Sequence, residues 1–113
     1  MLRNSAVIGC GQTKHASKRR EVNLAEMVSE AAWNAINDAE LDPNEIDAII
    51  VGNMQGFGGI AQPELWLSEW VCGEAKPVLR VTTGGTTGGS VGQAAFYAVA
   101  SGLYDKVQAI AWE

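Results

Sequence analysis

The sequence predicts an α/β fold with a mostly parallel sheet, and three observations support this class. Four short β-type runs alternate with helical patterns along the 113 residues, an order that gives right-handed crossovers between parallel strands. Residues 46–52 (IDAIIVG) are apolar on both sides, as a strand inside a parallel sheet requires. A glycine-rich turn at residues 84–89 (GGTTGG) leads from another β-type run into a long apolar segment.

The first half of the chain predicts one strand and one helix ahead of the strand at residues 46–52. Residues 6–9 form a short apolar run that ends in a GCGQ turn. Residues 23–39 then show apolar side chains at helical spacing. Asn23 and Glu26 have the types and the spacing of a capping box, so we expect the helix to begin there. Its apolar stripe consists of Leu24, Met27, Val28, Ala31, Ala35 and Ala39.

The second half predicts two more helices and two more strands. After a loop at residues 53–62, we expect residues 63–71 to form a helix that opens at a proline. Residues 78–82 are the third strand, residues 90–103 the third helix and residues 106–112 the fourth strand. The side chains that the helix at residues 63–71 is expected to bury are Leu65, Trp66, Leu67 and Trp70.

The helix predicted at residues 90–103 carries apolar residues all the way round. A helix of this kind is buried on every side, whereas a four-stranded sheet covers only one of those sides. We therefore expect residues 1–113 to form one portion of a larger domain, with no internal boundary.

Composition and charge exclude several classes of protein. A hydrophobic content of 47% with 19% charged residues excludes a disordered chain. A net charge of −5 argues against a nucleic-acid binder, which needs a basic face. No apolar run is long enough to cross a bilayer, so no membrane partner is expected. Cys10 and Cys72 lack metal-ligand spacing, and we expect no metal site and a reducing cytoplasm as the location.

The glycine-rich turn is the first candidate site. A strand that enters such a turn, followed by a helix, leaves unpaired helix N–H groups and a positive dipole end where a ligand can approach the backbone. One interpretation is that the turn lines a pocket and donates hydrogen bonds to a ligand carbonyl or oxyanion. The other is that the hydroxyls only cap the helix and the glycines only permit a tight turn. The residues concerned are Gly85, Thr86, Thr87, Gly88 and Gly89.

Two other segments are weaker candidates. Asn53, Gln55 and Gln62, in the loop after the second strand, form a second possible pocket surface or a plain mobile loop. The short basic cluster at residues 14–20 is either a solvated loop or a contact for a ligand phosphate. No Cys or His lies on the glycine-rich turn, and an unactivated Thr or Ser hydroxyl is a weak nucleophile.

The order of these segments closely resembles the N-terminal part of the thiolase superfamily. Three motifs carry the resemblance: IGxGQTK after the first strand, DPxxIDAxxVGN around the second strand, and VASGLYD after the third helix. The nearest branch is the lipid-transfer-protein type, which is related to sterol-carrier thiolases. Members are longer and fold as five alternating layers. The resemblance thus implies a partial thiolase-like fold, the first βαβαβαβ portion of the N-terminal half of an αβαβα architecture.

One departure from the family's pattern changes the implied chemistry. Thiolases carry their acyl-accepting cysteine in a pattern like A-C-A-S-G-G, and aligning residues 86–89 (TTGG) with A-S-G-G places the cysteine at Gly85. Glycine cannot form an acyl-enzyme. The resemblance then favours a branch that acts as steroid side-chain aldolases, which cleave a β-hydroxyacyl-CoA by a retro-aldol reaction. The alternatives are a thiolase-like acyltransferase with another acceptor and a non-catalytic acyl-CoA-binding, lipid-binding or structural subunit.

The resemblance also implies partners and limits. Coenzyme A is expected as part of an acyl-CoA substrate, with no covalently bound cofactor. A homodimer and a small partner that combines an OB-fold with a zinc ribbon are expected as well. The family's acid/base residues come from a second half, so no catalytic residue is assigned within residues 1–113. We therefore expect an aldolase (lyase) or acyltransferase of lipid or steroid degradation as the complete protein, and an inactive isolated 113-residue chain.

Overall fold

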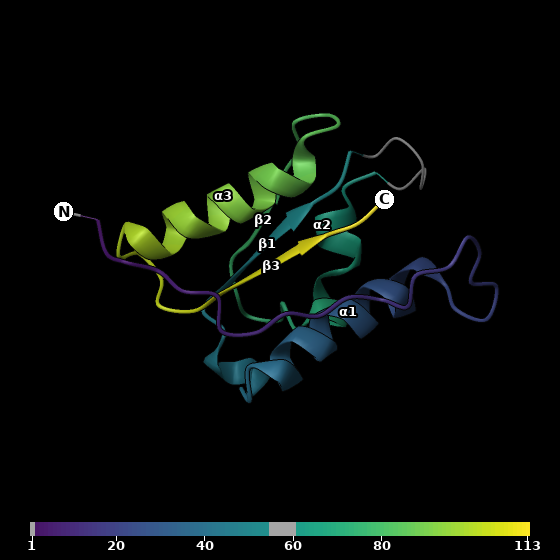
Figure 1. The fold of residues 1–113 in the computed structure, drawn as a ribbon, viewed down its shortest axis with the longest axis horizontal. Coiled ribbons are helices and arrows are strands. Elements are labelled where there is room, and N and C mark those ends of the chain that lie inside the picture. The colour runs from purple at the N-terminus through teal and green to yellow at the C-terminus, as the bar shows by residue number, and fades with distance from the viewer. Residues whose placement is uncertain (1, 55–60) are drawn as a thin grey trace.

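The computed structural model describes residues 2–54 and 61–113 and shows a small sheet between two layers of helix (Figure 1). α3 covers one face of the sheet, and α1 covers the other together with the 3-10 turn η2. The elements in chain order are α1 (Leu24–Asp38), η1 (Pro43–Glu45), β1 (Ala48–Gly52), α2 (Pro63–Trp66), η2 (Ser68–Val71), β2 (Val78–Val81), α3 (Thr87–Ala100) and β3 (Val107–Ala111).

The described strands form one parallel sheet in the order β2-β1-β3. β1 is the central strand, and all five of its residues are buried. Ile49 and Val51 pack into the core toward α1, while Gly52 contacts α3. The expectation of a parallel strand that is apolar on both faces is therefore confirmed, because each face of β1 has its own helical layer.

The start of α1 is confirmed, but its buried stripe is not the predicted one. Glu26 donates its backbone N–H to the Asn23 side chain at 2.9 Å, and the Glu26 carboxylate accepts the Asn23 N–H at 3.0 Å. Val28 is the one residue of the predicted stripe that is buried. The others are half-buried, and Gly9 and Gly11 of the N-terminal segment lie against Ala31, Ala35 and Ala39. The buried residues are Ala25, Val28, Ala32 and Ile36.

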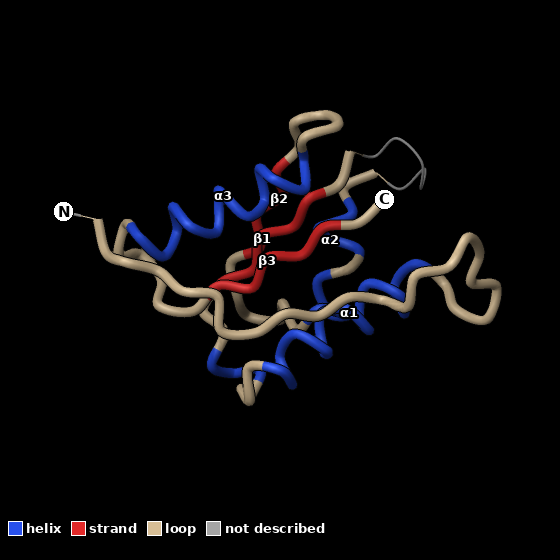
Figure 2. Tube along the Cα trace, viewed as in Figure 1, coloured by secondary structure: helices blue, strands red, loops and turns tan. Residues whose placement is uncertain are grey.

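The strand predicted at residues 6–9 is wrong. These residues carry no strand assignment, and most of them are exposed. Figure 2 shows the segment as a loop trace that runs past the strands. The physical reason is that its two ends are tied to helices instead of to the sheet. Arg3 bonds to the end of α3 and to the turn after it, and the Cys10 N–H donates to Asp38 of α1 at 2.8 Å.

The helix predicted at residues 63–71 is divided into α2 and η2. Leu67 is buried at 1% exposure as expected. Leu65, Trp66 and Trp70 are exposed at 69%, 51% and 38%, so their predicted burial is wrong. The break at Leu67 leaves α2 as one short turn, and η2 is the part of this segment that packs against α1.

α3 begins at Thr87 and ends at Ala100, three residues earlier at each end than predicted. Its buried residues are Thr87, Val91 and Ala100. Phe96 and Tyr97 are exposed at 45% and 56%. Within the described residues the sheet covers one side of α3, as expected for a sheet of this size, and the apolar residues on the other sides stay exposed.

Gly52 fixes how closely α3 approaches the sheet. A Cβ atom at this position would lie 2.1 Å from Val91 Cγ2 and 3.0 Å from Thr87 Cγ2. Real Cβ atoms do not tolerate a 2.1 Å contact, so only glycine permits this packing. The first turn of α3 is consequently held directly above the end of β1.

We predict that Gly52→Ala lowers the free energy of unfolding by about 1–3 kcal/mol, because the added methyl group overpacks the contact with Val91. Gly92→Ala is the control, since a Cβ there meets nothing within 4 Å. It should stabilise the helix by about 1 kcal/mol. Urea denaturation of both variants checks the prediction. The double variant Gly52→Ala/Val91→Ala should recover part of the loss, and a loss that is unchanged in the double variant would contradict the explanation.

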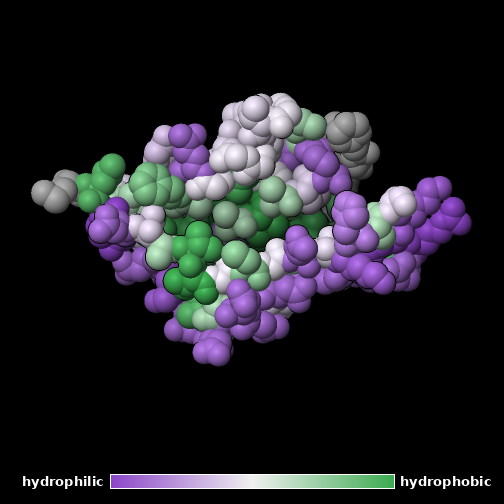
Figure 3. Space-filling view, in the orientation of Figure 1, coloured by the Kyte–Doolittle hydropathy of each residue, from purple (hydrophilic) through white to green (hydrophobic). Residues whose placement is uncertain are grey.

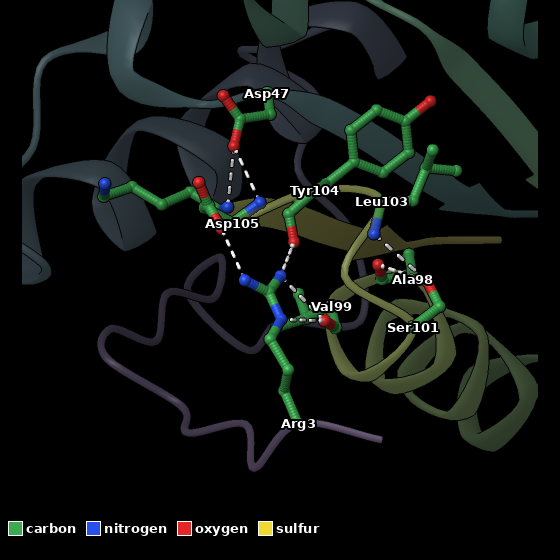
Figure 4. Close-up of polar contacts among 9 residues, drawn as sticks. Arg3, Asp47, Ala98, Val99, Ser101, Leu103, Tyr104 and Asp105 are labelled. Carbon is green, nitrogen blue, oxygen red and sulfur yellow. Dashed lines mark hydrogen bonds and ion pairs between the residues drawn. The ribbon is translucent and has the colours of Figure 1, made fainter. Parts of the chain in front are cut away.

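Asp47 holds the loop that enters β3 (Figure 4). Its carboxylate accepts the backbone N–H groups of Lys106 and Asp105, each at 2.9 Å. These two bonds, the one from Lys106 first, lower the pKa of Asp47 below its ordinary value. A lowered folded-state pKa means that the stabilisation is complete above the ordinary carboxyl pKa and is lost as the pH falls through the lower value.

We predict that Asp47→Asn lowers the melting temperature at pH 7 and that the gap to the wild type closes as the pH falls below about 4. Thermal unfolding followed by circular dichroism between pH 2 and pH 7 measures the gap. Glu74→Gln is the control, because Glu74 is exposed and has no hydrogen bond in the described structure. A gap that stays constant down to pH 2 would show that the charge of Asp47 is not the cause.

Candidate functional site

The glycine-rich turn is built by its own hydroxyl groups. Thr87 Oγ1 accepts the Thr83 N–H at 2.9 Å and donates to the Gly84 carbonyl at 2.7 Å. Thr86 Oγ1 donates to the Thr83 carbonyl at 2.8 Å. Thr83 Oγ1 lies 2.6 Å from Ser90 Oγ. These contacts fold the turn back on itself at the carboxyl end of β2.

The same contacts decide what the hydroxyls do. All the side-chain partners of Thr86, Thr87 and Ser90 are backbone groups of the turn or other hydroxyls of the turn. No titratable side chain bonds to them in the described structure. An activated nucleophile needs an adjacent base. The interpretation of these hydroxyls as structural groups of the turn is therefore the one that the contacts support.

Four backbone N–H groups of the turn have no hydrogen-bond acceptor in the described structure. Thr87 and Ser90 donate their N–H groups to carbonyls of the turn at 3.1 Å. No such bond is formed by the N–H groups of Gly85, Thr86, Gly88 and Gly89. All four residues are exposed, and the start of α3 contributes the positive end of the helix dipole. The arrangement suits a carbonyl oxygen that becomes negative.

The glycines leave the space beside these N–H groups open. A Cβ atom added at Gly85, Gly88 or Gly89 would meet nothing within 4 Å. Gly84 has a φ of +63°, which strains any other residue. The shape of the turn therefore requires glycine at position 84. At position 85, neither the backbone conformation nor a neighbouring atom requires glycine.

The second candidate surface was predicted from Asn53, Gln55 and Gln62, and only Gln62 is exposed among its described residues. Asn53 lies at the same edge of the sheet as the turn, because both follow the carboxyl ends of adjacent strands. It is 5% exposed, and its side chain donates to the Trp112 carbonyl at 3.0 Å. Gln62 is exposed and precedes α2, with a φ of +53°. Gln55 lies outside the described residues. Asn53 thus links β1 to the segment after β3 instead of facing outward.

The basic cluster is partly neutralised. Arg19 pairs with Glu30 at 2.7 Å and with Glu21 at 3.0 Å, and these bonds, the one to Glu30 first, raise its pKa. A cavity of about 410 Å³ lies beside it, between the loop and the start of α1. His15 belongs to this loop and is exposed. The internal ion pairs support the interpretation of a solvated loop.

The cysteines lie on other elements. Cys10 is exposed and follows the segment that packs on α1. Cys72 ends η2, and burial raises the pKa of its thiol. Among the described residues, no group of three or more His, Cys, Asp or Glu side chains is arranged to hold a metal ion. No helix in the described ranges is long and apolar enough to span a membrane.

Comparison with known proteins finds a protein that is similar in sequence. No family model matches the sequence. An acetyl-CoA acetyltransferase of Methanothermobacter thermautotrophicus (strain Delta H) is 34% identical over 110 residues. The match covers 94% of this chain and 28% of that protein.

Two solved structures have the same fold over most of the chain. The 3-oxoacyl-[acyl-carrier-protein] synthase III of Aquifex aeolicus VF5 superposes with a TM-score of 0.62 at 18% identity, over 74% of this chain and 27% of that one. The priming β-ketosynthase of the R1128 polyketide pathway gives 0.61 at 20% identity, over 74% and 25%. The chain therefore spans about a quarter of the length of the proteins it matches.

We predict that the two adjacent glycines of the turn respond differently to alanine. Gly84→Ala should cost about 1 kcal/mol of unfolding free energy, because an L-residue is strained at positive φ. Gly85→Ala should change stability by less than about 0.5 kcal/mol, since its surroundings are open. Urea denaturation of both variants measures the difference. Equal losses would mean that Gly85 is also a structural requirement of the turn.

Proposed function

We propose that this chain, which carries part of a thiolase-like fold, belongs to a protein that acts on CoA thioesters by retro-aldol cleavage of a β-hydroxyacyl-CoA. In this proposal the turn at residues 85–89 binds the thioester carbonyl, and no covalent acyl-enzyme forms. The observation that carries it is the set of four exposed N–H groups without acceptors beside Gly85, where thiolases have their cysteine.

The reaction needs charge stabilisation but no nucleophile. A base takes the proton of the β-hydroxyl group, and the oxygen's electron pair forms the new C=O bond of an aldehyde or ketone. The Cα–Cβ bond breaks, and its electrons pass into the thioester as an enolate. Protonation of the enolate at Cα then gives a shorter acyl-CoA. N–H donors aimed at the enolate oxygen supply the stabilisation that such a step requires.

The described residues supply the donors but no base. No carboxylate, imidazole or amine bonds to the turn, and Tyr97 and Tyr104 lie within α3 and beyond its end. The proposal therefore places the acid/base residues in a further part of the protein, outside residues 1–113. It includes the branch near lipid-transfer proteins, the homodimer and the small OB-fold/zinc-ribbon partner that the sequence resemblance implies. The isolated chain is expected to bind a thioester without turnover.

A thiolase-like acyltransferase is the second candidate, and one observation favours it. The relative with 34% identity is named as an acetyl-CoA acetyltransferase. This candidate needs an acyl acceptor other than Gly85. Cys10 is the exposed thiol of the described chain. A third candidate, a non-catalytic acyl-CoA-binding, lipid-binding or structural subunit, would bind the same ligand without cleaving it in the complete protein.

We predict that the wild-type chain gains no acyl group when it is incubated with acetyl-CoA and measured by denatured intact mass. A thiol at the start of a helix has a lowered pKa and reacts more readily. In a Cys10→Ser background, Gly85→Cys should therefore be acylated at least about ten times faster than Ser101→Cys, whose thiol lies at the other end of α3.

Two results of that experiment would contradict the proposal. A stoichiometric acyl adduct on the wild-type chain would favour the acyltransferase candidate. Equal acylation of Gly85→Cys and Ser101→Cys would mean that the turn does not receive the thioester. A separate assay tests where the catalytic base lies. Release of acetyl-CoA from 3-hydroxybutyryl-CoA by the chain alone would show that the base lies within residues 1–113 and would contradict the proposal.

A further inference from the structure

Positive charge is concentrated at one place in this acidic chain. The net charge is −5, yet four of the eight Lys and Arg residues lie within residues 14–20, on a loop that we call the basic loop. Figure 1 shows this loop at the right of the view, before α1, and Figure 3 shows mostly hydrophilic residues there. The four cations are Lys14, Lys18, Arg19 and Arg20. Charge of one sign that is gathered in this way attracts a ligand of the opposite sign.

Arg19 ties the basic loop to α1, and the other three cations have no partner. The Arg19 side chain is only 16% exposed, and it pairs with Glu30 of α1 at 2.7 Å and with Glu21 at 3.0 Å. The other three side chains are exposed and form no ion pair or hydrogen bond in the described structure. The chain by itself therefore presents solvated, unpaired charges on a loop whose position is held by Arg19.

The cavity of about 410 Å³ between the basic loop and the start of α1 has a basic side and an apolar side. Among the described residues no Asp or Glu lines it, although the sequence contains 13 acidic residues. A nucleotide matches this combination, because its phosphates need cations and its base has an apolar face. The lining side chains are Lys14, His15 and Lys18 from the loop, and Val22, Leu24 and Met27 from the segment that begins α1.

The N-terminus of α1 adds little to anion binding at this cavity. The Asn23 side chain accepts the Glu26 N–H, and the Glu26 carboxylate accepts the Asn23 N–H, so the capping box already supplies acceptors and a negative charge there. Recognition of a phosphate therefore depends on the lysine side chains of the loop.

The basic loop lies at the same end of the molecule as the glycine-rich turn. α1 and α3 each end shortly before the next parallel strand begins, so both helices start at the carboxyl edge of the sheet. Figure 1 shows the strand arrows pointing toward the side on which the loop and the start of α3 lie. A ligand that reaches both places carries its phosphates far from its reacting carbonyl. Acyl-CoA has this form, since the pantetheine arm separates the nucleotide from the thioester.

We propose that the basic loop binds the phosphate groups of the 3′-phospho-ADP part of CoA while the thioester carbonyl lies at the glycine-rich turn. This inference rests on the proposed function, because it takes an acyl-CoA as the substrate. Lys14 and Lys18 contact the phosphates as point charges, and the apolar side of the cavity contacts the adenine ring. An acyl chain carries no charge and gains nothing from these lysines.

The first test uses adenosine 3′,5′-bisphosphate, which carries phosphates and adenine but no thioester. In about 150 mM salt, which screens distant charges, its titration should shift the amide NMR signals of the residues that line the cavity. Lys18→Ser should raise the Kd at least about fivefold. Arg20→Ser is the matched control, because it removes one charge from the same loop at a residue that does not line the cavity, and it should raise the Kd less than about twofold.

Three results of the titration would overturn the proposal. The first is that the bisphosphate shifts no signal of the cavity. The second is an equal rise of the Kd in Lys18→Ser and Arg20→Ser, which would assign binding to general charge. The third is that inorganic phosphate binds the loop as tightly as the bisphosphate, which would exclude recognition of a nucleotide.

A second test links the basic loop to the turn. In a Cys10→Ser/Gly85→Cys chain, Lys18→Ser should slow acylation by subsaturating acetyl-CoA at least about fivefold. Acylation by S-acetyl-N-acetylcysteamine, which lacks the nucleotide, should keep its rate. Equal rates with acetyl-CoA before and after Lys18→Ser would overturn the proposal.

The two tests separate this proposal from the proposed function. If the turn does not receive the thioester, Gly85→Cys and Ser101→Cys are acylated equally by either thioester, while the bisphosphate still binds the loop. If the loop does not bind phosphate, the bisphosphate shifts no signal, while Gly85→Cys still reacts faster than Ser101→Cys.

Discussion

The contact between Gly52 and the first turn of α3 is the constraint on which the site depends. Because β1 ends in a residue without a side chain, Val91 and Thr87 rest directly on the strand. This close packing sets the height of α3 above the sheet and brings its free N–H groups to the carboxyl edge. A bulkier residue at position 52 would lift the helix, and the turn would move with it.

The structure is complete around β1 and incomplete at its margins. β1 has a neighbour on each side and a helical layer on each face, so its backbone and side chains are all satisfied. β3 has one paired edge, and Phe96 and Tyr97 of α3 remain exposed. Among the described residues, the turn offers donors without a base, and β3 pairs with a strand on one edge only. The chain matches about a quarter of the length of the proteins that it resembles.

Local patterns predicted the interior of the fold well. The capping box at Asn23, the apolar strand around Ile49 and the glycine-rich turn each depend on neighbours in sequence, and each is confirmed. Some predictions that depended on tertiary partners were wrong. Residues 6–9 have the composition of a strand, but Arg3 and the contacts with α1 hold them away from β3. The acceptor-free N–H groups at the start of α3 were expected from the strand-turn-helix pattern, whereas the threonine bonds that shape the turn are not revealed by spacing.

The central claim is that the turn donates hydrogen bonds to a thioester carbonyl, and a structure of the chain with bound acetyl-CoA tests it most directly. The account predicts that the carbonyl oxygen lies about 2.7–3.2 Å from backbone nitrogens of residues 85–89. A complex in which the thioester binds elsewhere, for example in the basic loop, while these nitrogens remain without a partner would contradict it.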